Sequence, residues 1–123
     1  MELAELCEKV LAIDSAVRYA SVLTRDGRKV AGGMRQGTES MEPKRVSEEM
    51  DFQTSHYHSS LERWEKHFGV LNFTFVNYQK VFVFFVPVGA YLLNVTTEPS
   101  FKLENLQDIL ALAMAARKTA APV

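Results

Sequence analysis

Residues 32–39, GGMRQGTE, contain two glycines with the spacing found in a phosphate-binding loop. Such a loop needs a lysine directly after its last glycine to reach the terminal phosphates, and then a hydroxyl for magnesium. This chain has Thr38 and Glu39 at those two positions, and a glutamate repels phosphate. Pro43 also displaces the helix whose N-terminus would point at the anion. The stretch therefore predicts no nucleotide hydrolysis.

Two other interpretations of these glycines stay open. In the first, Gly32 and Gly33 let a strand bend or pass beneath a side chain, and Gly37 is a loop glycine. In the second, glycine-rich backbone beside basic side chains holds an anion or an acidic partner. The candidate contacts for the second interpretation are Arg28, Lys29, Gly33, Arg35 and Gly37.

The histidines raise the possibility of a metal site. His56 and His58 are two residues apart, so on a helix they point to nearly opposite sides and cannot share an ion. His58 and Glu62 have the i, i+4 spacing of helical ligands, but no third ligand accompanies them. We therefore expect no metal, and histidines that are solvated or packed at an edge.

Cys7 is the sole cysteine, and it lies on the apolar stripe of an N-terminal helix. This position predicts a buried structural thiol and no internal disulfide, which is typical of a reducing, cytoplasmic compartment. The sequence has no Ser-His-Asp order, paired buried carboxylates or CxxC motif. We therefore expect a protein that is not an enzyme and needs no cofactor.

Composition limits the class of protein further. A chain of 123 residues with 47% hydrophobic residues is long enough for one domain, which we place at 1–118 with a flexible tail at 119–123. Residues 18–45 are locally basic while the rest is acidic, which argues against a nucleic-acid binder. The most apolar stretch, 81–93, is broken by Pro87 and Gly89 and is shorter than the ~20 residues of a membrane span. We expect no membrane insertion.

The elements that position these residues follow from periodicity. Apolar residues at i, i+3, i+4, i+7 and i+8 from Leu3 predict a helix ending near Ile13. Strands are expected at 18–23 and 29–34 around an Asp26-Gly27 turn, then at 70–76, 81–86 and 91–97. Helices are expected at 47–68 and 103–117, with a linker loop at 35–46. This order predicts an α+β domain with a five-stranded antiparallel sheet and helices on both faces.

The predicted helix 47–68 carries large side chains on one seam, at alternating steps of four and three: Met50, Thr54, Tyr57, Leu61, Trp64 and Phe68. Leu71, Phe73 and Phe75 share one side of the following strand. These residues either pack as core against the sheet or form a dimer interface. The surplus of large side chains on adjacent elements favours the dimer, since an obligate interface resembles a core cut in half.

The order of elements, the strand-turn-strand VRYASVLTRDGRKVAGG and the hairpin KVFVFFVPVGAYLLNVTTEP resemble the Roadblock family, a profilin-like fold. The stretches LCEKVLAIDSAVRYASVL, VAGGMRQG and LLNVTTEP are more closely similar to an archaeal protein family of unknown function. That second resemblance covers nearly the whole chain and implies no activity. The charged loop RQGTESMEPKR is longer than a plain Roadblock loop, which leaves the partner open.

The Roadblock resemblance implies a non-catalytic scaffold or regulatory module that docks a small GTPase or another protein. Family members form homodimers through the middle helix and the strand after it. Carried over by position, the interface candidates are Tyr57, Leu61, Trp64, Leu71, Phe73 and Phe75. The alternative is a domain that senses a small molecule or anion with the loop from Gly32 to Gly37.

Overall fold

The computed structural model describes residues 1–117, so the tail expected at 119–123 and the domain end expected at residue 118 lie outside the described residues. The elements, in chain order, are α1 (Leu3–Leu11), β1 (Val17–Thr24), β2 (Lys29–Met34), α2 (Lys44–Glu62), α3 (Glu65–Phe68), β3 (Thr74–Asn77), β4 (Phe82–Val88), β5 (Tyr91–Thr97), the 3-10 helix η1 (Leu103–Asn105) and α4 (Leu106–Arg117).

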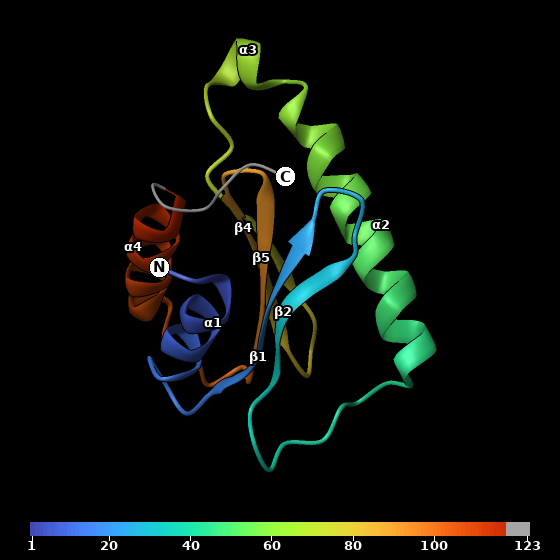
Figure 1. The fold of residues 1–123 in the computed structure, drawn as a ribbon, viewed down its shortest axis with the longest axis vertical. Coiled ribbons are helices and arrows are strands. Elements are labelled where there is room, and N and C mark those ends of the chain that lie inside the picture. The colour runs from blue at the N-terminus through green and yellow to red at the C-terminus, as the bar shows by residue number, and fades with distance from the viewer. Residues whose placement is uncertain (118–123) are drawn as a thin grey trace.

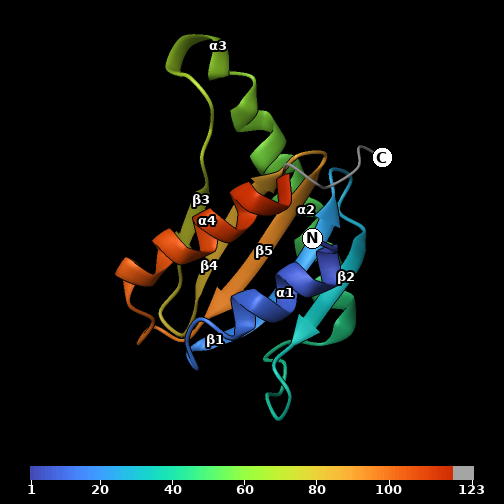
Figure 2. The same cartoon turned by 60° about the vertical axis from the view of Figure 1, so that its left-hand side comes forward.

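The five strands form one antiparallel sheet in the order β2-β1-β5-β4-β3. Helices α1 and α4 lie side by side on one face, and α2 lies alone on the other (Figures 1 and 2). The α+β class, the antiparallel sheet and its cover on both faces are confirmed. Strand β3 ends the sheet, so its outer edge has no neighbouring strand in the described part of the chain.

The main hydrophobic core lies between the sheet and the α1/α4 pair. The predicted stripe of α1 is confirmed, because Leu6, Cys7 and Val10 are all buried. They pack with residues of the central strands and of α4, among them Phe84 and Ile109. Burial raises the pKa of the Cys7 thiol to about 11, which keeps it protonated and unreactive at neutral pH. The prediction of a buried structural thiol is confirmed.

Strand β2 passes close beneath α1 at Gly32, as the first interpretation of the glycines predicted. Its φ of +88° lies in the left-handed region that favours glycine. A Cβ at this position would overlap the Ala20 carbonyl oxygen and lie 2.8 Å from Cys7 Sγ. Glycine is therefore required here for the approach of the strand to the helix.

The middle helix is shorter than the 47–68 predicted. It begins at Lys44 and ends at Glu62, and the separate turn α3 follows. The Arg63 side chain donates from Nε to the Ser60 carbonyl oxygen, the acceptor that the Trp64 amide would use in a continuing helix. The Trp64 amide turns to Leu61 O instead, at 3.2 Å. The prediction of one continuous helix was wrong because this local side-chain bond competes with the helix.

The strand predicted at 70–76 is also shorter, because β3 begins only at Thr74. It pairs with β4 from Thr74 opposite Phe85 to Asn77 opposite Phe82. Residues 70–73 leave the sheet and rise toward α3 (Figure 2). The side-chain alternation of a strand is present in 70–73, but no described strand lies beside them to accept their backbone hydrogen bonds.

Candidate interaction surface

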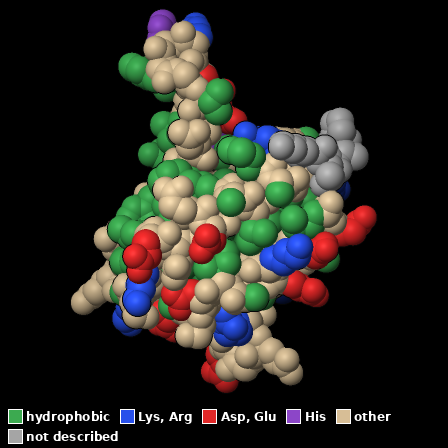
Figure 3. Space-filling view, turned by 90° about the vertical axis from the view of Figure 1, so that its left-hand side faces the viewer, with side chains coloured by type: hydrophobic (Ala, Val, Ile, Leu, Met, Phe, Trp, Pro, Cys, Tyr) green, Lys and Arg blue, Asp and Glu red, His purple; other side chains and the backbone are tan. Residues whose placement is uncertain are grey.

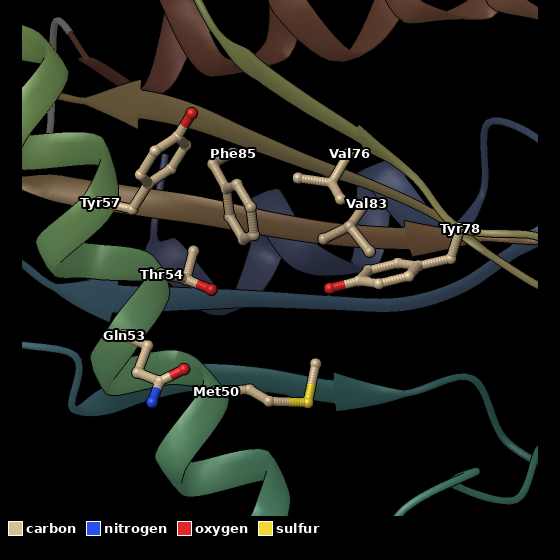
Figure 4. A pocket seen from close by; sticks show the side chains of 8 residues that line it. All are labelled: Met50, Gln53, Thr54, Tyr57, Val76, Tyr78, Val83 and Phe85. Atoms are coloured by element: carbon tan, nitrogen blue, oxygen red, sulfur yellow. The ribbon is translucent and has the colours of Figure 1, made fainter.

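Between α2 and the β3 side of the sheet lies a groove of about 200 Å³. Its wall comes from four residues of α2: Met50, Gln53, Thr54 and Tyr57. Its floor comes from β3, β4 and the turn between them: Val76, Tyr78, Val83 and Phe85. Figure 4 shows the side chains of the two sets on either side of the open space. We call this surface the groove.

The groove exists because α2 contributes so little to the core. Along α2, every residue of which is described, only Ser55 and His58 are buried. The second hydrophobic cluster consists of Leu23, Val83, Phe85 and Leu92 of the sheet, with Val76 and Val81 beside them. No α2 side chain of the described chain belongs to that cluster. The four sheet residues of the cluster are buried, and the incomplete cover is confined to the β3 side, where Val76 is half-buried and Tyr78 is 52% exposed.

The large side chains of the predicted seam are exposed. Met50 is 41% exposed, Tyr57 55%, Trp64 47% and Phe68 86%. The alternative that this seam is core is therefore wrong for these residues. Met50 and Tyr57 on α2, together with Trp64 and Phe68 beyond its end, therefore expose apolar area that a monomer would ordinarily bury.

A second hollow lies in the segment that connects α2 to β3. We call residues 63–73 the arm; it projects from the body of the domain, with a histidine and a basic side chain at its end and hydrophobic side chains below them (Figure 3). The hollow has a volume of about 490 Å³ and is lined by Leu61 and by arm residues from Trp64 to Phe73. Val70 is 68% exposed, so the arm, like α2, presents apolar side chains to solvent.

Five of the six interface candidates lie around these two hollows. Tyr57 lines the groove, and Leu61, Trp64, Leu71 and Phe73 line the hollow of the arm. Phe75 points to the opposite face of the sheet, where it stacks on Phe84 with ring centroids 4.9 Å apart. The sequence did not single out Tyr78, whose place in the groove depends on the turn that follows β3.

His58 holds α2 to the edge strand. Its Nδ1 lies 3.2 Å from the Thr74 hydroxyl, and its Nε2 lies 3.9 Å from a Glu62 carboxylate oxygen. The other Glu62 oxygen accepts a hydrogen bond from Arg25 at 2.6 Å. Burial lowers the pKa of His58, although the Glu62 charge opposes the shift. Of the two environments predicted for the histidines, His58 has the second: it packs against the edge strand β3 and is fully buried rather than solvated.

A second polar cluster lies under the N-terminal half of α2. Asp51 accepts a hydrogen bond from Asn94 Nδ2 at 3.4 Å, and Asn94 lies opposite Ser21 in the sheet. Burial raises the pKa of Asp51 to about 6; the Lys29 charge opposes that shift, and Glu42 adds to it. Polar rather than apolar contacts therefore fix the position of α2 on the sheet.

The basic residues proposed as anion contacts do not act together. The Arg35 guanidinium donates to three backbone carbonyl oxygens: Val17 O at 2.7 Å, Asp14 O at 2.8 Å, and Leu11 O. It joins the C-terminal end of α1 to β2, which leaves it little capacity for an anion. Arg28 and Lys29 are exposed, and Gly33 and Gly37 have open space around them. The structure thus assigns Arg35 a structural contact and leaves Arg28 and Lys29 on the surface.

Residues 1–117 contain no group of three or more His, Cys, Asp or Glu side chains placed to hold a metal ion. In the same range, no helix is both long enough and apolar enough to cross a membrane.

A single α2 facing the α1/α4 pair across this five-stranded sheet gives a Roadblock-like fold. A Roadblock/LC7 domain from Streptomyces avermitilis superposes with a TM-score of 0.73 at 16% identity, over 97% of this chain and 98% of its own. A structure of MglB gives 0.77 at 17% identity, over 94% and 85%. The gliding protein MglB from Thermus thermophilus gives 0.73 at 14% identity, over 94% and 88%. At these identities the likeness establishes the fold.

No protein-family model matches the sequence, and no curated protein does.

Proposed function

We propose that this protein is a non-catalytic scaffold or regulatory module that forms a homodimer through α2 and the edge of β3. The observation that carries the proposal is the groove: Val76 and Tyr78 on the β3 side of the sheet are incompletely covered, and the α2 residues Met50 and Tyr57, which also line the groove, are exposed. A second α2 has the shape and chemistry to fill this space. Pairing of two β3 edges would then satisfy backbone groups that have no neighbour in one chain.

The fold supports this reading. The Roadblock resemblance implies dimers of this kind, and one of the similar structures, MglB, has a tetrameric arrangement. The polar contacts that hold α2 on the sheet also agree with a dimer. Because Asp51, His58 and Glu62 make those contacts, the apolar side chains of α2 are left available to a partner.

The protein partner that we propose for the dimer is a small GTPase, as the resemblance implies. The surface we assign to it includes Arg28 and Lys29, which stand exposed at the turn between β1 and β2. Phe52 of α2 lies against that turn, since a Cβ added to Gly27 would come within 2.7 Å of the Phe52 Cα atom. The turn and α2 therefore form one surface that a single partner can contact.

The experiment is calorimetric titration of the purified protein with small GTPases loaded with GDP or a non-hydrolysable GTP analogue. We expect binding by the dimer that depends on the nucleotide state. Arg28→Glu should weaken this binding and leave the solution mass unchanged. Absence of binding to any GTPase, with the mass still that of a dimer, would contradict the partner and leave the dimer in place.

The arrangement disfavours the alternative of an anion-sensing loop, because the guanidinium of its central arginine, Arg35, already donates to three carbonyl oxygens.

A further inference from the structure

We infer that the arm docks this protein on the surface of an anionic lipid bilayer, where Phe68 and Val70 enter the headgroup region and basic side chains beside them contact phosphates. The inference goes beyond the proposed function and does not require the dimer, because neither Phe68 nor Val70 is an interface candidate or lines the groove. The expectation of no membrane insertion concerns the apolar stretch 81–93, whereas a docked arm lies on a bilayer without crossing it.

The most exposed apolar side chains of the arm flank a sharp turn of the chain. Gly69 has a φ of +87°, in the left-handed region that favours glycine, and it separates Phe68 from Val70. Phe68 is 86% exposed and Val70 is 68% exposed. A Cβ added to Gly69 would meet no atom within 4 Å, so the turn has open space beside it. Figures 1 and 2 show α3, which leads into this turn, projecting away from the sheet and from α1 and α4.

The charge that the arm presents to solvent is positive. Arg63 and Lys66 are exposed, and none of the ion pairs among residues 1–117 includes either side chain. The neighbouring acids Glu62 and Glu65 are only half-exposed. Glu65 accepts a hydrogen bond from a backbone amide of the arm at 2.7 Å, and Glu62 accepts one from Arg25 at 2.6 Å. Because the whole chain has a net charge of -1, this positive surface is a local property of the arm.

This combination of side chains fits a bilayer better than it fits a protein pocket. Aromatic and aliphatic side chains with basic residues around them are typical of segments that lie in a membrane interface. The stem of Lys66 can lie at the depth of the apolar side chains while its ammonium group reaches a phosphate. Trp64, 47% exposed on the same arm, is of the residue type enriched at that depth. A projecting arm can also reach a flat bilayer without any complementary shape elsewhere on the domain.

The first test is sedimentation of the protein with vesicles made of phosphatidylcholine and phosphatidylglycerol. We expect protein to sediment with these vesicles, and less of it when salt is added or when the vesicles contain phosphatidylcholine alone. Phe68→Ala and Lys66→Glu should each lower the partition coefficient about tenfold. Both side chains are exposed, so both variants should keep the fold, which circular dichroism checks.

Two variants outside the arm are the matched controls. Met114→Ala removes an exposed apolar side chain from α4, and Lys102→Glu reverses an exposed charge that precedes η1. Both should sediment with the vesicles as the parent does. If Lys102→Glu lost as much binding as Lys66→Glu, binding would follow net charge alone, and the arm would not be the docking element.

The second test uses Trp64, which is the one tryptophan of the sequence. Its fluorescence therefore reports on the arm alone. Vesicles that contain brominated lipid should quench this fluorescence when the parent binds, and should quench it less in Phe68→Ala. Protein that sediments with these vesicles without quenching would be bound through another surface, which would overturn the inference.

Binding to anionic vesicles that both arm variants weaken, together with quenching of Trp64, supports docking by the arm. Absence of binding at low ionic strength overturns it. Arm variants that change the solution mass, with no vesicle binding by the parent, would assign Phe68 and Lys66 to a protein contact and overturn the bilayer as the partner. Vesicle binding and solution mass are separate measurements, so failure of the first leaves the proposed dimer standing.

Discussion

The Nδ1 atom of His58 lies 3.2 Å from the hydroxyl of Thr74, and this contact joins the middle of α2 to the first residue of the edge strand β3. His58 is fully buried although it is polar. The His58 Nε2 atom has no hydrogen-bond partner among the described residues. The position of α2, and with it the shape of the proposed interface, therefore depends on a histidine held in its neutral form.

The first prediction concerns His58→Gln and pH. Burial lowers the folded-state pKa of His58 below the value of about 6.5 expected in the unfolded chain. The stability that depends on the neutral ring is therefore fully present above about pH 6.5 and is lost as pH falls through the folded-state pKa. Glu62, Glu65 and Arg25 are the charged groups that act on the ring.

We expect His58→Gln to unfold at lower urea concentration than the parent at pH 8, and this difference to shrink toward pH 5. The measurement is urea unfolding at one fixed protein concentration, with exposed His67→Gln as the matched variant. A difference that stays constant across this range would contradict the role of the neutral imidazole.

The second prediction concerns Asp51→Asn. The pKa of Asp51 is raised to about 6, above the unfolded value of 3.8, so ionising it in the folded protein costs stability. The stability contributed by the protonated Asp51 carboxyl is fully present below about pH 3.8 and is lost as pH rises through about 6. Asp51→Asn should therefore melt at a higher temperature than the parent at pH 8, and the gain should vanish near pH 4.

Asp26→Asn is a control of opposite sign, because the hydrogen bond from Thr24 lowers the pKa of exposed Asp26. If both asparagine variants shifted the melting temperature in the same direction at pH 8, the account of Asp51 would be wrong.

The third prediction tests the approach of β2 to α1. Gly32→Ala should lower the free energy of unfolding by about 3 kcal/mol or more, because the added methyl group overlaps backbone and the residue must keep a positive φ. Gly33→Ala, whose Cβ would meet nothing within 4 Å, should change it by less than about 1 kcal/mol. Chemical denaturation of both variants measures the difference, and equal effects would contradict the close approach.

The fourth prediction separates a structural role for Arg35 from an anion-binding one. Arg35→Ala removes the donor to three carbonyl oxygens and should destabilise the fold by about 2 kcal/mol. Arg28→Ala, exposed at the turn, should change stability by less than about 0.5 kcal/mol. The contrary result is that added phosphate or sulfate raises the melting temperature of the parent and leaves that of Arg35→Ala unchanged. This result would favour the anion site instead.

The sequence predicted the parts of this fold that depend on local pattern. The α1 stripe of Leu6, Cys7 and Val10 and the five strands are present because apolar periodicity and burial agree there. The end of α2 was missed because it depends on a side-chain bond from Arg63 to the Ser60 carbonyl, which no periodicity reveals. The buried state of His58 was missed for a related reason, since it depends on Thr74 across the fold.

The candidate surface was predicted in part. The large residues of the seam were identified from spacing, and the sequence left open whether they were core or interface. Their exposure could not be predicted, because it follows from the polar residues Asp51, His58 and Glu62 holding α2 against the sheet. The role of Arg35 was also out of reach, because its three acceptors are backbone atoms with no signature in the sequence.

The proposed interface is tested most directly by the solution mass of three chains, measured by light scattering over about a hundredfold dilution. Met50→Asp places a charge in the groove, and Met114→Asp places the same charge on an exposed methionine of α4. We predict that the parent and Met114→Asp have about twice the 13.9 kDa mass of one chain, and that Met50→Asp has the mass of one. A monomeric parent, or a Met50→Asp chain as dimeric as Met114→Asp, would contradict the account.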